Sequence, residues 1–490
     1  MFLAIIVSLF SCNYNSNNPS GLNENRVVPS AIQVEYQQME LIGFIHFTIN
    51  TFTNKEWGFG DEDPKIFNPT EMDVEQWVIV AREGGMKELI LTAKHHDGFC
   101  LWPSNYTEHS VKNSPYKNGN GDIVKEFVEA CRKHGLKVGL YLSPWDRNHK
   151  DYGKPEYLIY YKNQITELLT QYGSINEIWF DGANGGDGYY GGANETRRID
   201  SQTYYNWDDI FALVKELQPN IKIFSDGGPD IRWIGNENGY AGSTFWSTIK
   251  KDSIIIGNSN PKYLNTGEEG GNNWIIGQCD VSIRPGWFYH QAEDSLVKTP
   301  QELVDIYYKS VGRNSVLLIN LPPNKKGLIH NNDINSLKVF KKILDSTFAN
   351  NLAAGASCST TNYRLEDKDF YPNNIVDDNK ETYWATDELT LPAEVCIELK
   401  EEQLFDRILI QEPVRLGQRI SKFRIEILLN NNWEPIFEGT TIGYKRIIRI
   451  PTVRASKIKL TVTDANNTVA ISNFGIFKAS EEEYTNFIIQ

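Results

Sequence analysis

The amino-acid sequence predicts an α/β protein, a (β/α)8 TIM-like barrel followed by a C-terminal β-sandwich domain. Near-continuous apolar segments alternate with helical patterns over roughly 300 residues, which is typical of a parallel sheet covered by helices. Seven or eight units of this kind favour a closed barrel over an open sheet. Beyond residue 345 the helical periodicity gives way to short β-rich segments divided by turns, as in a sandwich, at 394–399, 407–411, 422–429, 446–450 and 457–462.

The expected barrel elements follow one another in strict alternation. A helix should begin after Asp122, carry Phe127 and Cys131 on its apolar face, and end at His134-Gly135. Another should open at Thr299-Pro300. Strands are expected at 41–47, 88–93, 137–142, 177–180, 221–224, 280–283 and 315–321, and further helices near 76–81, 160–172 and 207–217.

The chain is expected to divide into three parts: a signal segment with its linker at 1–28, the barrel at 29–345 and the sandwich at 346–490. Residues 2–10 are almost wholly apolar but too few to span a bilayer. The following Ser11-Cys12 and a run rich in Asn and Ser resemble a bacterial lipoprotein signal. We therefore expect export to the periplasm or outer membrane of a Gram-negative bacterium, with a lipid anchor at Cys12.

Composition excludes several classes of function. Net charge is −14 and the pI is about 5.2, so the surface repels phosphate backbones and nucleic acid is not an expected partner. The six cysteines form no CxxC pair and no zinc spacing. No GxGxxG motif or P-loop is present, which counts against the main nucleotide-binding folds.

Polar residues gather where the predicted strands end. In a parallel barrel the carboxyl ends of all strands meet at one rim, and catalytic groups lie there. His46 ends the first strand, His95-His96 the second and Asp181 the fourth, while the fifth leads to the loop that holds Glu237. If Asp181 and Glu237 face one pocket, they supply the two carboxyl groups that cleavage of a glycosidic bond requires.

Each of these residues also has a simpler interpretation. Asp181-Gly182 could be a plain turn after a strand, Glu237 a solvated loop residue, and His46 a core histidine. His95-His96 could bind a metal, but adjacent strand residues point to opposite faces, so sharing one ion would require the strand to break there. The simpler interpretations become improbable together, because the residues follow successive strands of one barrel.

Several stretches of the chain resemble the α-L-fucosidases of glycoside hydrolase family 29. They are GFIHFTINTFTNKEWG, LTAKHHDGFCLWPS, KVGLYLSPWD, EIWFDG, GPDIRWIGNENG and VSIRPGWFYH. The last two are similar to the subfamily that acts on α-1,3- and α-1,4-linked fucose. The resemblance implies Asp181 as nucleophile and Glu237 as acid/base. It also implies a fucose site formed by His46, Glu56, Trp57, His95, His96, Tyr141, Trp179 and Trp287.

The function predicted from this resemblance is that of a retaining exo-α-L-fucosidase. It would hydrolyse terminal α-1,3/1,4-linked L-fucose in oligosaccharides or glycoconjugates, and the chemistry requires no metal or organic cofactor. Two alternatives stay open: a catalytically weak surface glycan-binding protein, and a retaining hydrolase of a related sugar such as galactose. The intact carboxylates disfavour the first alternative, and the histidine-rich pocket disfavours the second.

The sequence departs from the family pattern at two places. The segment after Asp181 is longer than usual and could line the side of the leaving group. Gln278 stands where many relatives carry Glu, which leaves Glu268 and Glu269 as fallback candidates for the acid/base.

The C-terminal part resembles discoidin-type (F5/8 type C) domains and family-32 carbohydrate-binding modules. The resemblance rests on the stretch NIVDDNKETYW at 374–384 and implies a structural Ca²⁺ near Asp377, Asn379 and Thr382. Whether this domain binds sugar or only packs on the barrel stays open.

Overall fold

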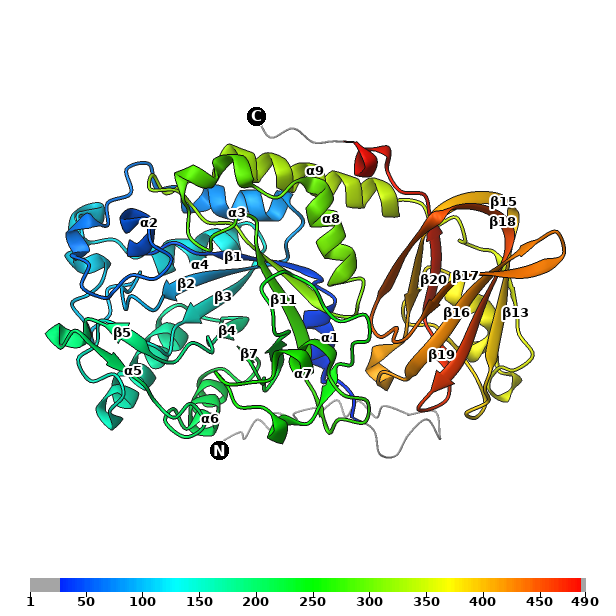
Figure 1. Ribbon diagram of the computed structural model, residues 1–490, viewed down its shortest axis with the longest axis horizontal. Helices are drawn as coiled ribbons and strands as arrows, with labels where there is room; N and C mark the ends of the chain where they lie inside the picture. The colour runs from blue at the N-terminus through cyan, green and yellow to red at the C-terminus, as the bar shows by residue number, and fades with distance from the viewer. Residues whose placement is uncertain (1–26, 486–490) are drawn as a thin grey trace, which may run out of the picture.

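A computed structural model describes residues 27–485, so the predicted signal and lipid anchor at Cys12 lie outside the described residues (Figure 1). Eight parallel strands close into a barrel in the order β1-β12-β11-β8-β7-β4-β3-β2, which confirms the predicted fold class. The strands are β1 Leu41–Ile45, β2 Glu88–Lys94, β3 Lys137–Leu142, β4 Glu177–Trp179, β7 Lys222–Ser225, β8 Ile231–Trp233, β11 Ile276–Ser282 and β12 Val316–Asn320.

Helices cover the outside of this barrel. Asp122 accepts a hydrogen bond from the Lys125 amide at the start of α4, as expected of an N-cap, and Thr299 forms a capping box with Glu302 at the start of α8. The helices are α1 Ala31–Gln37, α2 Ile49–Thr53, α3 Val74–Glu83, α4 Ile123–Lys133, α5 Pro155–Gln171, α6 Trp207–Leu217, α7 Pro261–Thr266, α8 Pro300–Lys309 and α9 Asn331–Phe348.

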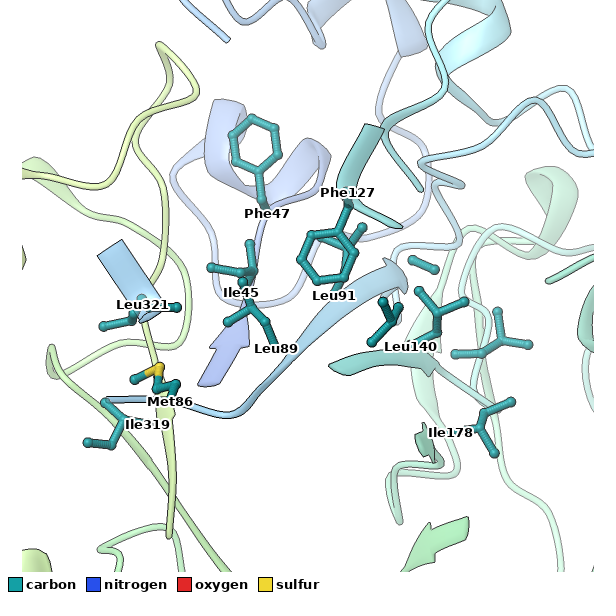
Figure 2. Close-up of a cluster of buried hydrophobic side chains, with 14 of the residues drawn as sticks. Ile45, Phe47, Met86, Leu89, Leu91, Phe127, Leu140, Ile178, Ile319 and Leu321 are labelled. Atoms are coloured by element: carbon teal, nitrogen blue, oxygen red, sulfur yellow. The ribbon is translucent and has the colours of Figure 1, made fainter. Parts of the chain in front are cut away.

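Side chains alternate between the two faces of the barrel wall. Leu89 and Leu91 of β2 pack outward with Phe127 of α4 (Figure 2), whereas Ile90 between them belongs to the cluster inside the barrel. Both faces are therefore apolar, and the interior is a packed core rather than a channel.

One barrel strand is absent from the sequence prediction. β8 follows β7 after the short turn 226–230, with no helix between them, and pairs in parallel with both β7 and β11. The loop with Glu237 therefore follows the sixth barrel strand, and the expectation that it follows the fifth is wrong. The three residues of β8 include the charged Arg232, and no helix separates β8 from β7, so neither an apolar run nor the strand–helix alternation indicates it in the sequence.

The C-terminal part is built on antiparallel strands that enclose a second core. The segments expected at 394–399 and 407–411 form one continuous strand, β15, and those at 446–450 and 457–462 form β18; register shifts after Glu398 and Phe405 interrupt the pairing of these two long strands. The strands of this part are β13 Ser357–Ser359, β14 Trp384–Ala385, β15 Ala393–Gln411, β16 Ile420–Leu429, β17 Asn432–Gly439, β18 Arg446–Ala465, β19 Ala470–Ile471 and β20 Asn473–Phe477.

Buried polar contacts join the barrel to the sandwich. The Glu40 carboxylate at the start of β1 accepts hydrogen bonds from Tyr444 (2.6 Å) in the sandwich and from Tyr307 (2.7 Å) of α8. Asn314, before β12, accepts from the Tyr444 amide at 2.7 Å and donates to Gln418 at 3.2 Å. Because these groups are largely withdrawn from water, separating the two parts would leave them unpaired, and this favours one fixed arrangement.

Candidate active site

A cavity of about 170 Å³ opens at the carboxyl ends of the barrel strands. It is lined by all ten residues that the sequence predicts for the site: His46, Glu56, Trp57, His95, His96, Tyr141, Trp179, Asp181, Glu237 and Trp287. Three further residues line it that the prediction does not include, namely Phe44, Ala183 and Asp280. A larger hollow of about 690 Å³, around Lys137 and Lys222 at the opposite end of the barrel, contains none of them.

Asp181 projects into this cavity from the end of β4. Its Oδ2 accepts a hydrogen bond from the Tyr141 hydroxyl at 2.9 Å, and its Oδ1 accepts from the Ala183 amide at 2.7 Å. His96 Nε2 lies 3.8 Å from Oδ2. Donors to both oxygens fix the direction of the carboxyl group, and its side chain is 25% exposed.

Glu237 lies at the mouth of the cavity, in the loop after β8. Its Oε2 accepts a hydrogen bond from the indole Nε1 of Trp287 at 2.9 Å. The loop is fixed by an antiparallel bridge between Asn238 and Val281 of β11. Asp181 and Glu237 thus reach one cavity from different strands, β4 and β8.

Glu56 supports the segment that carries Trp287. One of its oxygens accepts from the Trp287 amide at 2.8 Å, and the other accepts from the Phe288 amide at 3.2 Å and contacts His290 Nε2 at 2.6 Å. Its carboxylate therefore already holds the loop after β11 in place, in addition to lining the cavity.

Both neighbouring histidines line the cavity because β2 is interrupted before them. Thr92 pairs with Tyr141 while Lys94 pairs with Leu142, so Ala93 is an extra residue in the ladder and the strand ends at Lys94. The rings of His95 and His96 consequently lie side by side, with their centroids 4.2 Å apart. The described residues contain no group of three His, Cys, Asp or Glu side chains placed to hold a metal ion.

The three histidines are uncharged at neutral pH. Burial lowers the pKa of His46 to about 3 and that of His96 to about 4, and burial together with its histidine neighbours lowers the pKa of His95 well below its ordinary value. Each neutral ring carries one hydrogen-bond donor and one acceptor, which is the combination that recognises sugar hydroxyl groups.

Neighbouring residues determine which ring nitrogen carries the proton. His46 Nδ1 lies 2.9 Å from the Asn320 side-chain oxygen, which can only accept, so Nδ1 donates and Nε2 is left as an acceptor. His96 Nδ1 lies 2.7 Å from the Ser143 hydroxyl, which donates its own hydrogen to the Trp145 carbonyl. His96 Nδ1 therefore also donates, and its Nε2 is free to accept from a ligand hydroxyl.

Trp179 forms the aromatic wall and is held from below. Its ring stacks on Phe224 with centroids 3.9 Å apart, and its Nε1 donates to Gln278 Oε1 at 2.8 Å. Gln278 lies in the barrel interior beneath the cavity and does not line it. Glu268, one of the fallback candidates, is occupied by Lys250 and Tyr263, and neither it nor Glu269 lines the cavity.

A second cavity of about 380 Å³ adjoins the first and shares Trp179, Asp181, Ala183, Glu237 and Asp280 with it. It continues past Trp233 to the segment 257–259. The long segment after Asp181 contributes only its first residues to these walls. Its hairpin, β5 Gly186–Gly188 with β6 Glu195–Arg197, instead packs on the loop after β3, where Arg147 donates to the Asp187 carbonyl.

The residues expected to bind calcium lie in one turn of the sandwich domain. Asp377 accepts hydrogen bonds from the Asn379 amide at 2.9 Å and from the Thr382 hydroxyl at 2.8 Å. The set offers carboxylate, amide and hydroxyl oxygens, the donor type that calcium prefers, so the residues fit the ion chemically. Calcium binding stays a prediction.

Models of known protein families match both parts of the chain. The family model described as alpha-L-fucosidase matches residues 28–346, and the F5/8 type C domain model matches residues 355–474. The chain belongs to the α-L-fucosidase family. This confirms the resemblance to glycoside hydrolase family 29 and the prediction of an α-L-fucosidase, with an F5/8 type C domain after the barrel.

Individual members of the α-L-fucosidase family are similar over almost the whole chain. Alpha-L-fucosidase 1 of Arabidopsis thaliana is 43% identical over 96% of this chain and 92% of its own length. A glycoside hydrolase 29 family member from an unknown rumen bacterium superposes with a TM-score of 0.83 at 45% identity, covering 93% of this chain and 78% of the other. The Ruminococcus gnavus GH29 fucosidase E1_10125 in complex with fucose gives a TM-score of 0.82 at 35% identity, with coverages of 95% and 99%.

The neutral state of the histidines can be tested through stability. Unfolding exposes His96 to water, where its pKa returns to about 6.5, so below that value the unfolded chain binds a proton that the folded chain does not bind until pH falls to about 4. Between pH 7 and 5 the wild type should lose about 2 kcal/mol more unfolding free energy than His96→Asn, as measured in urea. An equal loss in both proteins would contradict the neutral assignment.

Proposed function

We propose that this fucosidase is an exo-acting, retaining enzyme that releases terminal α-1,3/1,4-linked L-fucose from oligosaccharides or glycoconjugates. The observation that carries the proposal is the convergence of Asp181 and Glu237, from different barrel strands, on one small cavity lined by three uncharged histidines and aromatic rings. Glycoside hydrolases cleave the glycosidic bond with two carboxyl groups, one on either side of the sugar ring.

In the first step Asp181 attacks the anomeric carbon. The hydrogen bonds from Tyr141 and the Ala183 amide hold the carboxyl group aimed into the cavity. Glu237, in its protonated form, gives its proton to the leaving oxygen as the glycosidic bond breaks. The products are a fucosyl ester of Asp181 and the free remainder of the glycan.

In the second step water resolves this ester. Glu237, now ionised, takes a proton from the water that attacks the same anomeric carbon, and Asp181 leaves as a carboxylate. Two displacements at one carbon give net retention of configuration. A retaining enzyme requires carboxyl groups roughly 5–5.5 Å apart, whereas an inverting enzyme places them about 6.5–9.5 Å apart.

The two cavities support exo action on a branched or extended glycan. Trp179 and Gln278 close the floor beneath the first cavity, so a chain cannot continue through it. The Nε2 atoms of His46 and His96 can accept hydrogen bonds from fucose hydroxyls, and the ring of Trp287 can pack against the apolar face of the sugar. The second cavity, which begins at Glu237, is in the position to receive the leaving saccharide.

Export and lipid anchoring remain predictions from the N-terminal segment. No helix among residues 27–485 is long and apolar enough to cross a bilayer. We propose that the mature protein is attached through Cys12 and meets its fucosylated substrates outside the cytoplasmic membrane.

Replacing Asp181 and replacing Glu237 should impair catalysis in different ways. Asp181→Ala removes the nucleophile and should lower kcat on every fucoside, on the order of 10³-fold or more. Glu237→Ala removes only the proton donor, so natural oligosaccharides should lose about 10²–10⁴-fold while aryl fucosides with a good leaving group lose much less. Glu268→Ala is the matched control and should retain activity. Equal losses on both substrate types in Glu237→Ala would point to another acid.

Linkage preference can be read from released fucose. Incubation with 2-, 3- and 4-linked fucosyl oligosaccharides, followed by chromatography, should show release from the 3- and 4-linked substrates well ahead of the 2-linked one. Preferential release from the 2-linked substrate would contradict the proposed linkage. Release of galactose in place of fucose would contradict the proposed sugar, and binding without release would indicate a glycan-binding protein.

A further inference from the structure

Asp280 lies between the two cavities and has no role in the two-step mechanism. It stands on β11, two residues after Gln278, and therefore points into the barrel as Gln278 does. Its side chain is 3% exposed and borders both cavities. Its Oδ1 accepts a hydrogen bond from Trp233 Nε1 at 2.9 Å. No Lys or Arg among the described residues forms an ion pair with it.

Backbone pairing brings Glu237 to the same face as Asp280. The antiparallel bridge between Asn238 and Val281 sets Glu237 opposite Ser282. Asp280 is two residues from Ser282 and shares its face, so it is the diagonal neighbour of Glu237. Diagonal neighbours have Cα atoms about 7–8 Å apart, which lies within the reach of a long side chain such as glutamate.

The charges around Asp280 are almost all negative. Both cavities are also lined by Asp181, after β4, and Glu237, in the loop after β8, and the second is lined by Asp226, in the turn after β7. No lining residue of either cavity is Lys or Arg. The other titratable groups that line these cavities are His46, Glu56, His95, His96 and Tyr141. Carboxyl groups gathered without a cation cannot all be ionised, so protons must remain among them.

The pKa shifts of two of these carboxyl groups agree with this expectation. Burial, and next the negative charge of Glu237, raise the pKa of Asp280 well above its ordinary value. Burial likewise raises the pKa of Asp226 to about 6. Asp226 therefore loses its proton near pH 6, whereas Asp280 holds its proton more firmly than an ordinary carboxyl group does.

We propose that Asp280 and Glu237 form a carboxyl pair that holds one proton between them and so keeps the acid/base supplied with it. The inference rests on the proposed function of Glu237. In the first step the shared proton goes to the leaving oxygen, and both carboxyl groups are left with none. In the second step Glu237 takes a proton from the attacking water, which returns the pair to its starting state.

The pair makes a signed prediction for the pH dependence. In the wild type, loss of the shared proton would leave Asp280 and Glu237 as two adjacent carboxylates. Their mutual repulsion raises the pH at which the pair loses this proton. In Asp280→Asn, Glu237 ionises without that repulsion, so the alkaline limb of kcat/KM should move to lower pH by about one unit or more. Activity at neutral pH should fall accordingly and recover toward acid pH.

Trp233→Phe is the matched control, because it removes only the indole that donates to Asp280. A merely structural role for Asp280 would make the two variants behave alike. We expect the alkaline limb of Trp233→Phe to stay in place or move to higher pH. An alkaline limb in Asp280→Asn that is unmoved, or moved to higher pH, would overturn the proposal. Thermal unfolding of both variants checks that each is folded.

Infrared spectroscopy separates this proposal from the proposed function. At about pH 8, above the pKa of Asp226, the wild type should show a protonated-carboxyl band that Asp280→Asn lacks. Without that band the pair is refuted even if the enzyme releases fucose. If the band is present and no fucoside is cleaved, the proposed function fails while the proton-holding pair stands.

Discussion

The site depends on closure of the barrel between β8 and β11. Three residue pairs, Ile231 to Trp233 against Ile276 to Gln278, join these strands in parallel. Beyond them the chain turns, and its Asn238 returns to Val281 on the same strand. This brings Glu237 to the rim already occupied by Asp181 and places Asp280 beside it. Without that closure Glu237, after β8, and Asp280, on β11, would stand at opposite edges of an open sheet.

The rest of the cavity is fixed by hydrogen bonds that leave little freedom to its walls. Three indole N–H groups at the site have an acceptor: Gln278 for Trp179, Asp280 for Trp233, and Glu237 for Trp287. Held in this way, the aromatic surfaces stand ready before the sugar arrives, so binding need not order them. His46 and His96 are fixed in a similar way, since Asn320 and Ser143 determine which of their ring nitrogens carries the proton.

Much of the site could be predicted from the sequence because its residues lie at the ends of long apolar strands. His46, His95 and Asp181 follow such strands directly, and family motifs extend the list. β8 could not be predicted, because it contains the charged Arg232 and no helix separates it from β7. The role of Asp280 could not either, because its proton depends on carboxyl groups that only closure brings together. The sequence divided β15 into two segments because the polar run 400–403 interrupts it, and its pairing with β18 shifts register at the same place, between Glu398 and Gln403.

In this mechanism Asp181 attacks the sugar, and Glu237, across the same cavity, first donates a proton and then takes one up. The mechanism is tested most directly by trapping the enzyme with an activated 2-deoxy-2-fluoro fucoside, which slows the second step, and sequencing the labelled peptide by mass spectrometry. The account predicts one fucosyl ester, on Asp181. A label on any other carboxyl group, or turnover with inverted configuration and no covalent species, would contradict it.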